Sequence, residues 1–300
     1  MPCRLKLAIP KPIRAALDKD AVFSLSLSGG KDSQAMIAAV QREFSAEWME
    51  LIHADLGKAE WPQTPAFVDH LAHVVFNLPL AIVRRTKGDL VDRIKERLNT
   101  VSTVDPTRPA KPFWPSAAQR YCTSDLKRDP IHKHQRSMVK AGILISCMGF
   151  RAEESTGRAK RPILSVEKRI SSKQYRSLSP AQAVRRYSKG RLVLNWLPIH
   201  SWTIEDVWEE LGTSVEDLEH RRQLYRENRE TEALEGWPAH PAYVYGNERL
   251  SCALCVLGCI GDLKNGKKHH PELYQIFVDL EKKSGYTFRD GFSLTELSDN

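Results

Sequence analysis

Residues 28–33 bring two glycines, a lysine, an aspartate and two serines together in the string Ser-Gly-Gly-Lys-Asp-Ser. Two adjacent glycines allow a sharp turn and leave the backbone N–H groups uncovered. If a helix begins here, its N-terminal amides and its dipole attract an anion, and Lys31 adds a point charge. We therefore predict a nucleotide phosphate site, in which Ser28, Ser33 and the loop amides hold a pyrophosphate. The spacing does not match a Walker A loop, and a purely structural strand–helix turn is the alternative.

A second group of candidate residues consists of Cys252, Cys255 and Cys259, three thiols within eight residues. A CxxC turn brings two sulfur atoms to one metal, and three neighbouring ligands need a fourth. We expect Cys122 to supply it, because it precedes a helix outside the apparent core, whereas Cys147 lies in an apolar strand and is expected to be buried. Four thiolates suit a 4Fe–4S cluster or structural zinc, and the lack of a second CxxC pair favours the cluster. Redox or packing thiols are the remaining alternative.

The composition narrows the class of protein. The chain has 300 residues, a formal net charge of +8 and 41% hydrophobic residues, which suits a sizeable core and a surface that attracts anionic partners. No apolar run is long enough to cross a bilayer, and the N-terminus lacks the apolar core of a signal peptide. We expect a soluble cytoplasmic protein without a membrane partner, whose cysteines are metal ligands or reactive thiols rather than disulfides.

These residues must be positioned by alternating strands and helices. Apolar runs predict strands at 23–27, 48–54, 80–83, 143–148 and 192–196. Helical spacing predicts helices at 65–76, 90–98, 123–140, 203–208, 214–228 and 271–284, besides one that follows the loop 28–33. The alternation is typical of an α/β fold with a doubly wound parallel sheet, whose ligands bind at the carboxyl ends of the strands. Asp55 and the loop both follow such ends, and Asp32 or Ser33 is expected to cap the first helix.

The segment 156–191 is strongly basic, with eleven lysines and arginines and a single acid, Glu167. Such a segment is either a solvated, mobile loop or a surface that contacts the phosphate backbone of a nucleic acid. Tyr175 and Tyr187 lie among the basic residues, where they could stack on bases.

We divide the chain into a lead-in at 1–20, a nucleotide-binding domain at 21–211 with 156–191 as an insertion, and a helical C-terminal lobe at 212–300 that carries the cysteine cluster. Within the domain, the proline-rich stretch 99–118 is expected to form a loop over the site or an excursion from the sheet.

Taken in order, several segments from about residue 22 to residue 261 resemble the phosphoadenosine phosphosulfate (PAPS) reductase family. This family includes the DndC-like proteins of DNA phosphorothioation and belongs to the PP-loop ATP pyrophosphatase superfamily. The segments that carry the resemblance are 28–33, 55–57 with 61–64, 120–127, 149–155 with Arg158, Pro198 with Trp202 and 206–208, and Cys252 with Cys255.

The resemblance implies an adenine nucleotide alpha hydrolase-like fold that binds ATP or a related adenylate with Mg²⁺. It places Asp55 near the metal or the ribose, and Lys127 and Arg151 near the anionic part of the substrate or the surroundings of the cluster. We expect Lys31, Asp32, Lys127 and Arg151 to be catalytic. The nucleotide-binding residues implied are Ser28, Gly29, Gly30, Lys31, Asp32, Ser33, Asp55 and Arg158. Trp202 and Trp208 are expected to pack in the core.

The chain departs from the reductases of this family. Those that carry a cluster show a cysteine pair where this chain has Tyr121 and Cys122, and they use a further cysteine near the C-terminus, whereas no cysteine follows Cys259 here. We therefore favour DndC-like sulfur transfer: ATP cleavage activates a target, and sulfur supplied by a cysteine desulfurase or another relay protein replaces the activated oxygen at the Fe–S cluster. The basic segment 156–191 suits a DNA target. The alternatives are an adenylylsulfate or PAPS reductase with a rearranged cysteine set, and a non-enzymatic, nucleotide-sensing DNA-binding regulator.

Overall fold

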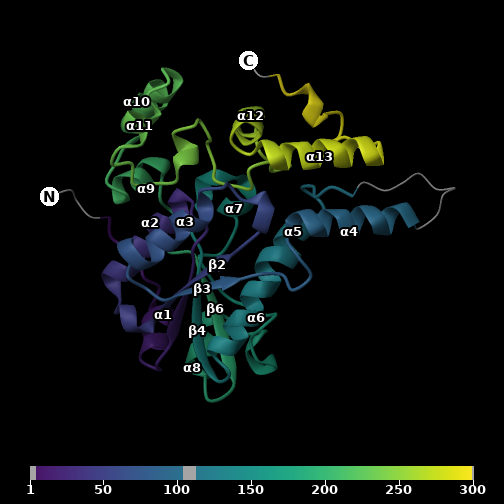
Figure 1. Cartoon of the computed structure of the whole chain (residues 1–300). Helices are drawn as coiled ribbons and strands as arrows, with labels where there is room; N and C mark the ends of the chain where they lie inside the picture. Colours follow the sequence, from purple (N-terminus) through teal and green to yellow (C-terminus); the bar gives the residue numbers. More distant parts are fainter. Residues whose placement is uncertain (1–4, 104–112, 299–300) are drawn as a thin grey trace.

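The computed structural model describes residues 5–103 and 113–298. Its centre is a six-stranded sheet in the order β3-β2-β1-β4-β6-β5 (Figure 1). The strands are β1 (Val22–Ser26), β2 (Met49–Ala54), β3 (Leu80–Val83), β4 (Gly142–Cys147), β5 (Leu164–Val166) and β6 (Arg191–Trp196). All adjacent pairs are parallel except β5 with β6. The predicted doubly wound α/β sheet is confirmed, with β5 as an antiparallel edge strand that the sequence analysis missed.

Strand β1 is buried on both faces. Its alternation of apolar residues with serines predicts one solvated face, yet Ser24 is as fully buried as Phe23. Gln135 of α6 explains the difference, because its Nε2 donates to Ser24 Oγ at 3.0 Å and to Ser146 Oγ at 2.9 Å. A side-chain amide thus satisfies the hydroxyls on the second face, and the serines do not need water.

Helices cover both faces of this sheet. Helix α6 contacts β2 and β3, whereas residues of α1, α2 and α8 share the largest apolar core with β1. The helices are α1 (Lys11–Leu17), α2 (Lys31–Glu43), α3 (Thr64–His70), α4 (Leu90–Thr103), α5 (Tyr121–Thr123), α6 (Asp129–Met138), α7 (Thr156–Ala159), α8 (Pro180–Arg185), α9 (Ile204–Glu210), α10 (Val215–Arg226), α11 (Glu230–Leu234), α12 (Ile260–His269) and α13 (Pro271–Ser284). Shorter 3-10 turns include η2 (Gly57–Ala59) and η7 (Pro241–Tyr243).

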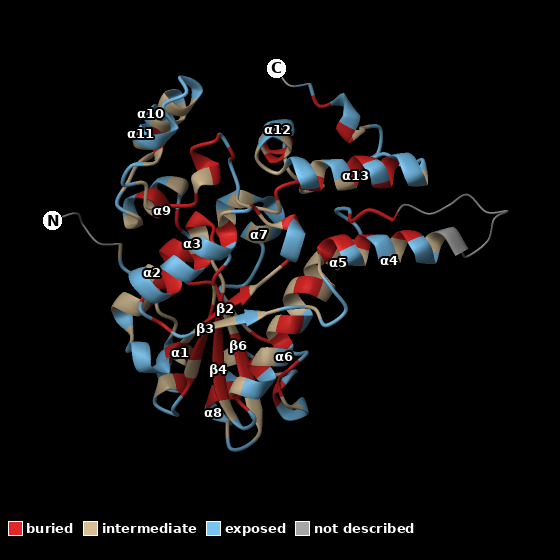
Figure 2. Cartoon of the chain, viewed as in Figure 1, coloured by how far each residue is buried: buried red, intermediate tan, exposed pale blue. Residues whose placement is uncertain are grey.

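A second apolar core joins the C-terminal helices to the first half of the chain. Val91 and Ile94 of α4 belong to the same cluster as Leu263 of α12 and Phe277 of α13. Figure 2 shows buried positions on both α4 and α13, which lie side by side. Residues on both sides of the predicted boundary at 211/212 therefore share this core.

Several predicted elements differ in detail. The helix predicted at 123–140 consists of α5, a π-helical turn over Ser124–Arg128 and α6, and α3 likewise continues into a π-helical turn over Leu71–Val75. In the stretch predicted as a loop at 99–118, α4 runs to Thr103 and Trp114 is buried, while residues 104–112 lie outside the described part. Within the described ranges, no helix has the length and apolar character needed to cross a membrane.

Candidate nucleotide site and cysteine loop

The phosphate loop, residues 28–33, connects the carboxyl end of β1 to α2. Ser33 Oγ donates to the carbonyl oxygen of Gly30 at 2.8 Å and accepts the backbone N–H of Ser28 at 3.2 Å. The two serines thus hold the loop in shape. The N-cap of α2 is Gly30, so the prediction that Asp32 or Ser33 caps this helix is wrong. Helical dihedral angles already begin at Lys31, and the hydroxyl of Ser33 is engaged inside the loop.

Two glycines allow other segments to approach this loop closely. Gly29 has a φ of +75°, a left-handed conformation that favours glycine. Gly149 follows β4, and a Cβ at this position would lie 2.5 Å from the carbonyl oxygen of Asp32 and 2.9 Å from the nitrogen of Ser33. The segment after β4 therefore lies directly against the loop, which brings Arg151 to it.

Three charged side chains form a buried network at the start of α2. Lys31 is 4% exposed, and its Nζ lies 3.2 Å from Asp32 Oδ2. Arg151, also 4% exposed, donates from Nε to Asp32 Oδ1 at 2.5 Å. Burial alone would raise the pKa of Asp32, but Lys31 and Arg151 outweigh it and lower that pKa below its usual value. The structure thus brings these three predicted residues together, with Asp32 as an ionised carboxylate between two cations.

Tyr243 completes this site from the C-terminal part of the chain. Its hydroxyl accepts the backbone N–H of Lys31 at 3.0 Å, and the Lys31 ammonium lies 5.2 Å from the centre of its ring and 5.8 Å from that of Trp208. Trp208 is buried in the core, as is Trp202, which confirms the packing predicted for both. The sequence analysis missed Tyr243, because only the folded chain brings it to the loop.

His240 supports the turn that carries Tyr243. Its Nδ1 accepts the backbone N–H of Ala242 at 3.1 Å, which leaves Nε2 to donate to Thr64 Oγ1 at 3.2 Å. Burial lowers the pKa of His240 to about 4, so the ring is neutral near pH 7. The tautomer is therefore fixed by these two contacts.

Asp55 and Arg158 are engaged with other side chains. Asp55 accepts the backbone N–H of Gly57 at 2.6 Å and the Nε–H of Arg84 at 2.6 Å. Arg158 pairs with Glu154, and its guanidinium lies 4.7 Å from the centre of the Phe150 ring. The nucleotide contacts implied for Asp55 and Arg158 remain predictions.

The three thiols of the cysteine loop, residues 252–259, differ from one another in their surroundings. Burial and the neighbouring Cys255 raise the pKa of Cys252 to about 12, Lys127 opposes this effect, and Cys122 adds to it. These three cysteines and Lys127 are therefore neighbours. Cys259 is exposed, and its Sγ accepts the backbone N–H of Asp262 at 3.3 Å as the N-cap of α12.

The predicted four-thiolate centre is not assembled in this arrangement. Over residues 5–103 and 113–298, no group of three or more His, Cys, Asp or Glu side chains is placed to hold a metal ion. The cluster, or zinc in its place, remains a prediction. Cys147 is fully buried in β4, as expected for a core residue.

A histidine connects the two parts of the site. His53 Nδ1 donates to the carbonyl oxygen of Leu27 at 2.9 Å, just before the phosphate loop, and His53 Nε2 lies 3.4 Å from Glu60 Oε2. Burial disfavours the charged imidazole, but Glu60 outweighs it and raises the pKa of His53 above 6.5. Glu60 also raises the pKa of Cys252, and the backbone N–H of Ala253 donates to the carbonyl oxygen of Ala59 at 3.0 Å, so Glu60 lies near the cysteine loop. The pattern of the predicted strand 48–54 gave no sign of this role.

The basic segment 156–191 contributes β5 to the sheet, and its cations lie in two groups at opposite edges of the sheet. Because β5 runs antiparallel to β6, Arg158 and the exposed Lys160 and Arg161 lie near the edge where the parallel strands end. The exposed cations that follow β5 lie toward the opposite edge: Lys168, Arg169, Lys173, Arg176, Arg185, Arg186 and Lys189.

The tyrosines of this segment do not point outward together. Tyr175 is 1% exposed, its hydroxyl donates to the carbonyl oxygen of Lys189 at 2.7 Å, and its ring stacks on Tyr187 at 5.8 Å. The prediction that Tyr175 is available to stack on bases is therefore wrong. The segment forms a strand and a helix, which turn this ring into the core.

Comparison with protein-family models identifies the family. A model of the phosphoadenosine phosphosulfate reductase domain matches residues 22–227, which include the phosphate loop, Cys122 and Arg151 but not the cysteine loop. No curated protein sequence matches the chain. Among solved structures that match, phosphoadenylyl-sulfate (PAPS) reductase from Candida auris, crystallised as a phosphate complex, is 15% identical. That match covers 67% of this chain and 77% of the other, with a TM-score of 0.41.

Proposed function

Because the chain belongs to the phosphoadenosine phosphosulfate reductase domain family, we propose that it is an enzyme that uses an adenine nucleotide in sulfur chemistry. The observation that carries the proposal is the phosphate loop. Its glycine-capped helix start lies beside the buried cations Lys31 and Arg151. Backbone amides and cations arranged in this way bind phosphate groups and stabilise charge that develops on a leaving pyrophosphate.

In this proposal Asp32 orients rather than transfers a proton. An ionised carboxylate with a cation on each oxygen is a poor general base, because protonating it would break both pairs. Asp32 instead fixes Lys31 and Arg151 beside the loop, where their charge would stabilise a bound phosphate. ATP or a related adenylate, with Mg²⁺, is the ligand we propose for this place.

The first candidate reaction is sulfur transfer to an activated target, as in the DndC-like branch. ATP would be cleaved between its α- and β-phosphates, the target oxygen would leave with AMP, and sulfur would take its place. The neighbouring thiols Cys122, Cys252 and Cys255, with Lys127 beside them, support a sulfur-handling role. A cysteine desulfurase or another relay protein would supply the sulfur as a persulfide, and a second cysteine thiol would then form a disulfide with the carrier sulfur, which leaves one sulfur atom on the target. A nucleic-acid target bound at the edge of the sheet where the parallel strands end would contact Arg158, Lys160 and Arg161 rather than the whole basic segment.

The second candidate is reduction of a sulfonucleotide, and Cys259 favours it. This thiol is exposed and lies at the N-terminus of α12, a position typical of reactive cysteines. It is not among the groups that most strongly influence the pKa of Cys252. Cys259 is therefore free to attack the sulfur of an adenylyl sulfate, which releases the nucleotide and leaves the sulfonate on the thiol until a thiol reductant frees sulfite.

Two assays on the same protein test these candidates. Pyrophosphate release from ATP should be lost in Lys31→Ala and retained in Cys259→Ser if the reaction is sulfur transfer. Sulfite release from adenylyl sulfate or PAPS with a thiol reductant should be lost in both variants if it is reduction. Lys133→Ala, an exposed lysine of α6, is the matched control. Unchanged activity in Lys31→Ala would contradict the assigned site, and nucleotide binding without either product would favour a regulator.

A further inference from the structure

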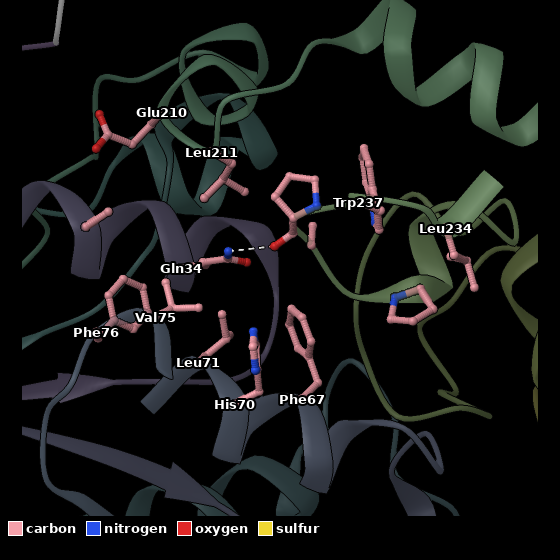
Figure 3. Close-up of a pocket in the computed structure, with 14 residues that line it drawn as sticks. Gln34, Phe67, His70, Leu71, Val75, Phe76, Glu210, Leu211, Leu234 and Trp237 are labelled. Carbon is pink, nitrogen blue, oxygen red and sulfur yellow. Dashed lines mark hydrogen bonds between the residues drawn. The ribbon is translucent and has the colours of Figure 1, made fainter. Parts of the chain in front are cut away.

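A cavity of about 440 Å³ lies between α2, α3, the end of α9 and the segment 234–241 (Figure 3). No residue of the phosphate loop lines it, so it is distinct from the nucleotide site. Its volume falls in the range of small-molecule sites. Most of its wall is apolar, and the larger apolar side chains are Phe67, Leu71, Phe76, Leu211, Leu234 and Trp237.

Gln34 supplies a buried acceptor to this cavity. Its side chain is 5% exposed, and its Nε2 donates to the carbonyl oxygen of Pro238 at 2.8 Å, as the dashed line in Figure 3 marks. A carbonyl oxygen can only accept, so the amide of Gln34 cannot be turned over. Its Oε1 is therefore fixed on the other side, where it has no hydrogen-bond partner. A buried acceptor without a donor is costly, and a bound N–H group would remove that cost.

The other polar groups around the cavity are already engaged or lie at its margin. Glu210 forms a two-point ion pair with Arg42, and Trp237 Nε1 donates to the carbonyl oxygen of His240 at 3.3 Å. His70 is exposed. Among the described residues that line the cavity, no side chain therefore offers an uncompensated charge to an ionic ligand, and Gln34 Oε1 is the side-chain atom that lacks a hydrogen-bond partner.

We propose that this cavity binds a small, neutral, ring-containing molecule that donates an N–H to Gln34 Oε1. The rings of Phe67 and Trp237 favour a flat aromatic body, because aromatic pairs gain from contact with each other as well as from burial. Such a ligand would contact both α2 and the segment 237–241, which are joined by the Gln34–Pro238 hydrogen bond. The proposal does not depend on the reaction at the nucleotide site.

Indole and benzofuran are the probes, because they have nearly the same shape and only indole carries an N–H. Titration calorimetry on the whole protein should give roughly tenfold tighter binding for indole, the effect of one hydrogen bond to a buried acceptor. Equal affinities for the two probes, or no binding of either, would overturn the proposal.

Three variants locate the bound probe. Gln34→Met should abolish the preference for indole, whereas Gln41→Met should retain it, since Gln41 of the same helix also donates to a backbone carbonyl, that of Phe76, at 2.7 Å. Ala38→Phe should fill the cavity and abolish binding of both probes. If Gln34→Met does not fold, the binding of the two probes to the wild type and to Ala38→Phe tests the proposal. Indole binding that survives Ala38→Phe would place the probe elsewhere and overturn the proposal.

Discussion

Replacing Tyr243 with phenylalanine is expected to tighten nucleotide binding while it lowers the stability of the free protein. The hydroxyl of Tyr243 accepts the N–H of Lys31 inside the protein, and a phosphate at the start of α2 would accept the same N–H. The two acceptors therefore compete. In the wild type, a nucleotide must displace the hydroxyl or forgo this donor, whereas in Tyr243→Phe the donor is free.

The magnitudes follow from the burial of this contact. Loss of the hydroxyl leaves the Lys31 N–H without an acceptor, which should lower the free energy of unfolding by about 1–3 kcal/mol. The gain in nucleotide affinity is limited by the net value of the displaced hydrogen bond, about 0.5–1.5 kcal/mol, or about two- to tenfold in Kd. Burial raises the pKa of Tyr243, so the hydroxyl stays neutral and the effect should not depend on pH near 7.

Calorimetric titration with a non-hydrolysable ATP analogue measures the affinity, and urea unfolding measures the stability. Tyr245→Phe is the matched control, because Tyr245 is buried two residues away but stacks on His269 at 3.9 Å, apart from the loop. Weaker nucleotide binding by a folded Tyr243→Phe would refute the competition and make the hydroxyl a support for the bound state. An unchanged Kd beside a clear loss of stability would show that the phosphate does not use the Lys31 N–H.

Other substitutions test the remaining contacts. Gly149→Ala should weaken nucleotide binding at least about tenfold and lower the free energy of unfolding by about 1–3 kcal/mol, because the added Cβ would lie 2.5 Å from a backbone oxygen. Gly157→Ala is the control: Gly157 has open space around it, so this variant should change neither the nucleotide affinity nor the stability. Gln135→Leu leaves two buried serine hydroxyls without their hydrogen-bond donor and should lower the free energy of unfolding, measured in urea, by about 2–4 kcal/mol. Because the pKa of His53 is raised, its ion pair with Glu60 stabilises the fold fully below about pH 6.5, and this stabilisation is lost as the pH rises through the pKa of the folded state. His53→Gln should therefore lower the free energy of unfolding more at acidic than at alkaline pH. The pKa of His240, lowered to about 4, has the opposite sign: stability should fall by about 3 kcal/mol as pH falls from about 6.5 to 4, and His240→Gln should flatten that part of the profile.

The parts of the molecule that the sequence predicts correctly are those in which local patterns and packing agree. The strand before the phosphate loop, the sharp turn at its glycines and the helix predicted at 203–208 depend on neighbours in the chain. Tyr243 is different, because its bond to Lys31 joins residues 212 positions apart. No spacing rule reveals such a pair, since only the packing of the C-terminal helices against the sheet brings it together.

Composition alone also misleads where a segment has its own secondary structure. The charge of 156–191 suggests a solvated surface with available aromatic rings, yet the chain there forms β5, α8 and the start of β6, whose inward positions must be apolar. Tyr175 occupies one of these inward positions, so its ring is not available to stack on a base. The cations stay exposed because their side chains can extend into water, but the strand directions send them to opposite edges of the sheet.

The same reasoning applies to Cys259, on which the choice between the two reactions depends. Its spacing from Cys255 suggests a common metal, but spacing cannot say whether the same thiol also caps a helix that begins after it. In the fold, α12 begins directly after Cys259, so the thiol becomes the helix cap while Cys252 is half-buried near Cys122 and Cys255. An exposed thiol that caps a helix is chemically distinct from a half-buried thiol that lies near other thiols. Mild alkylation followed by peptide mapping should therefore modify Cys259 before Cys252, and the reverse order would contradict this distinction between the two thiols.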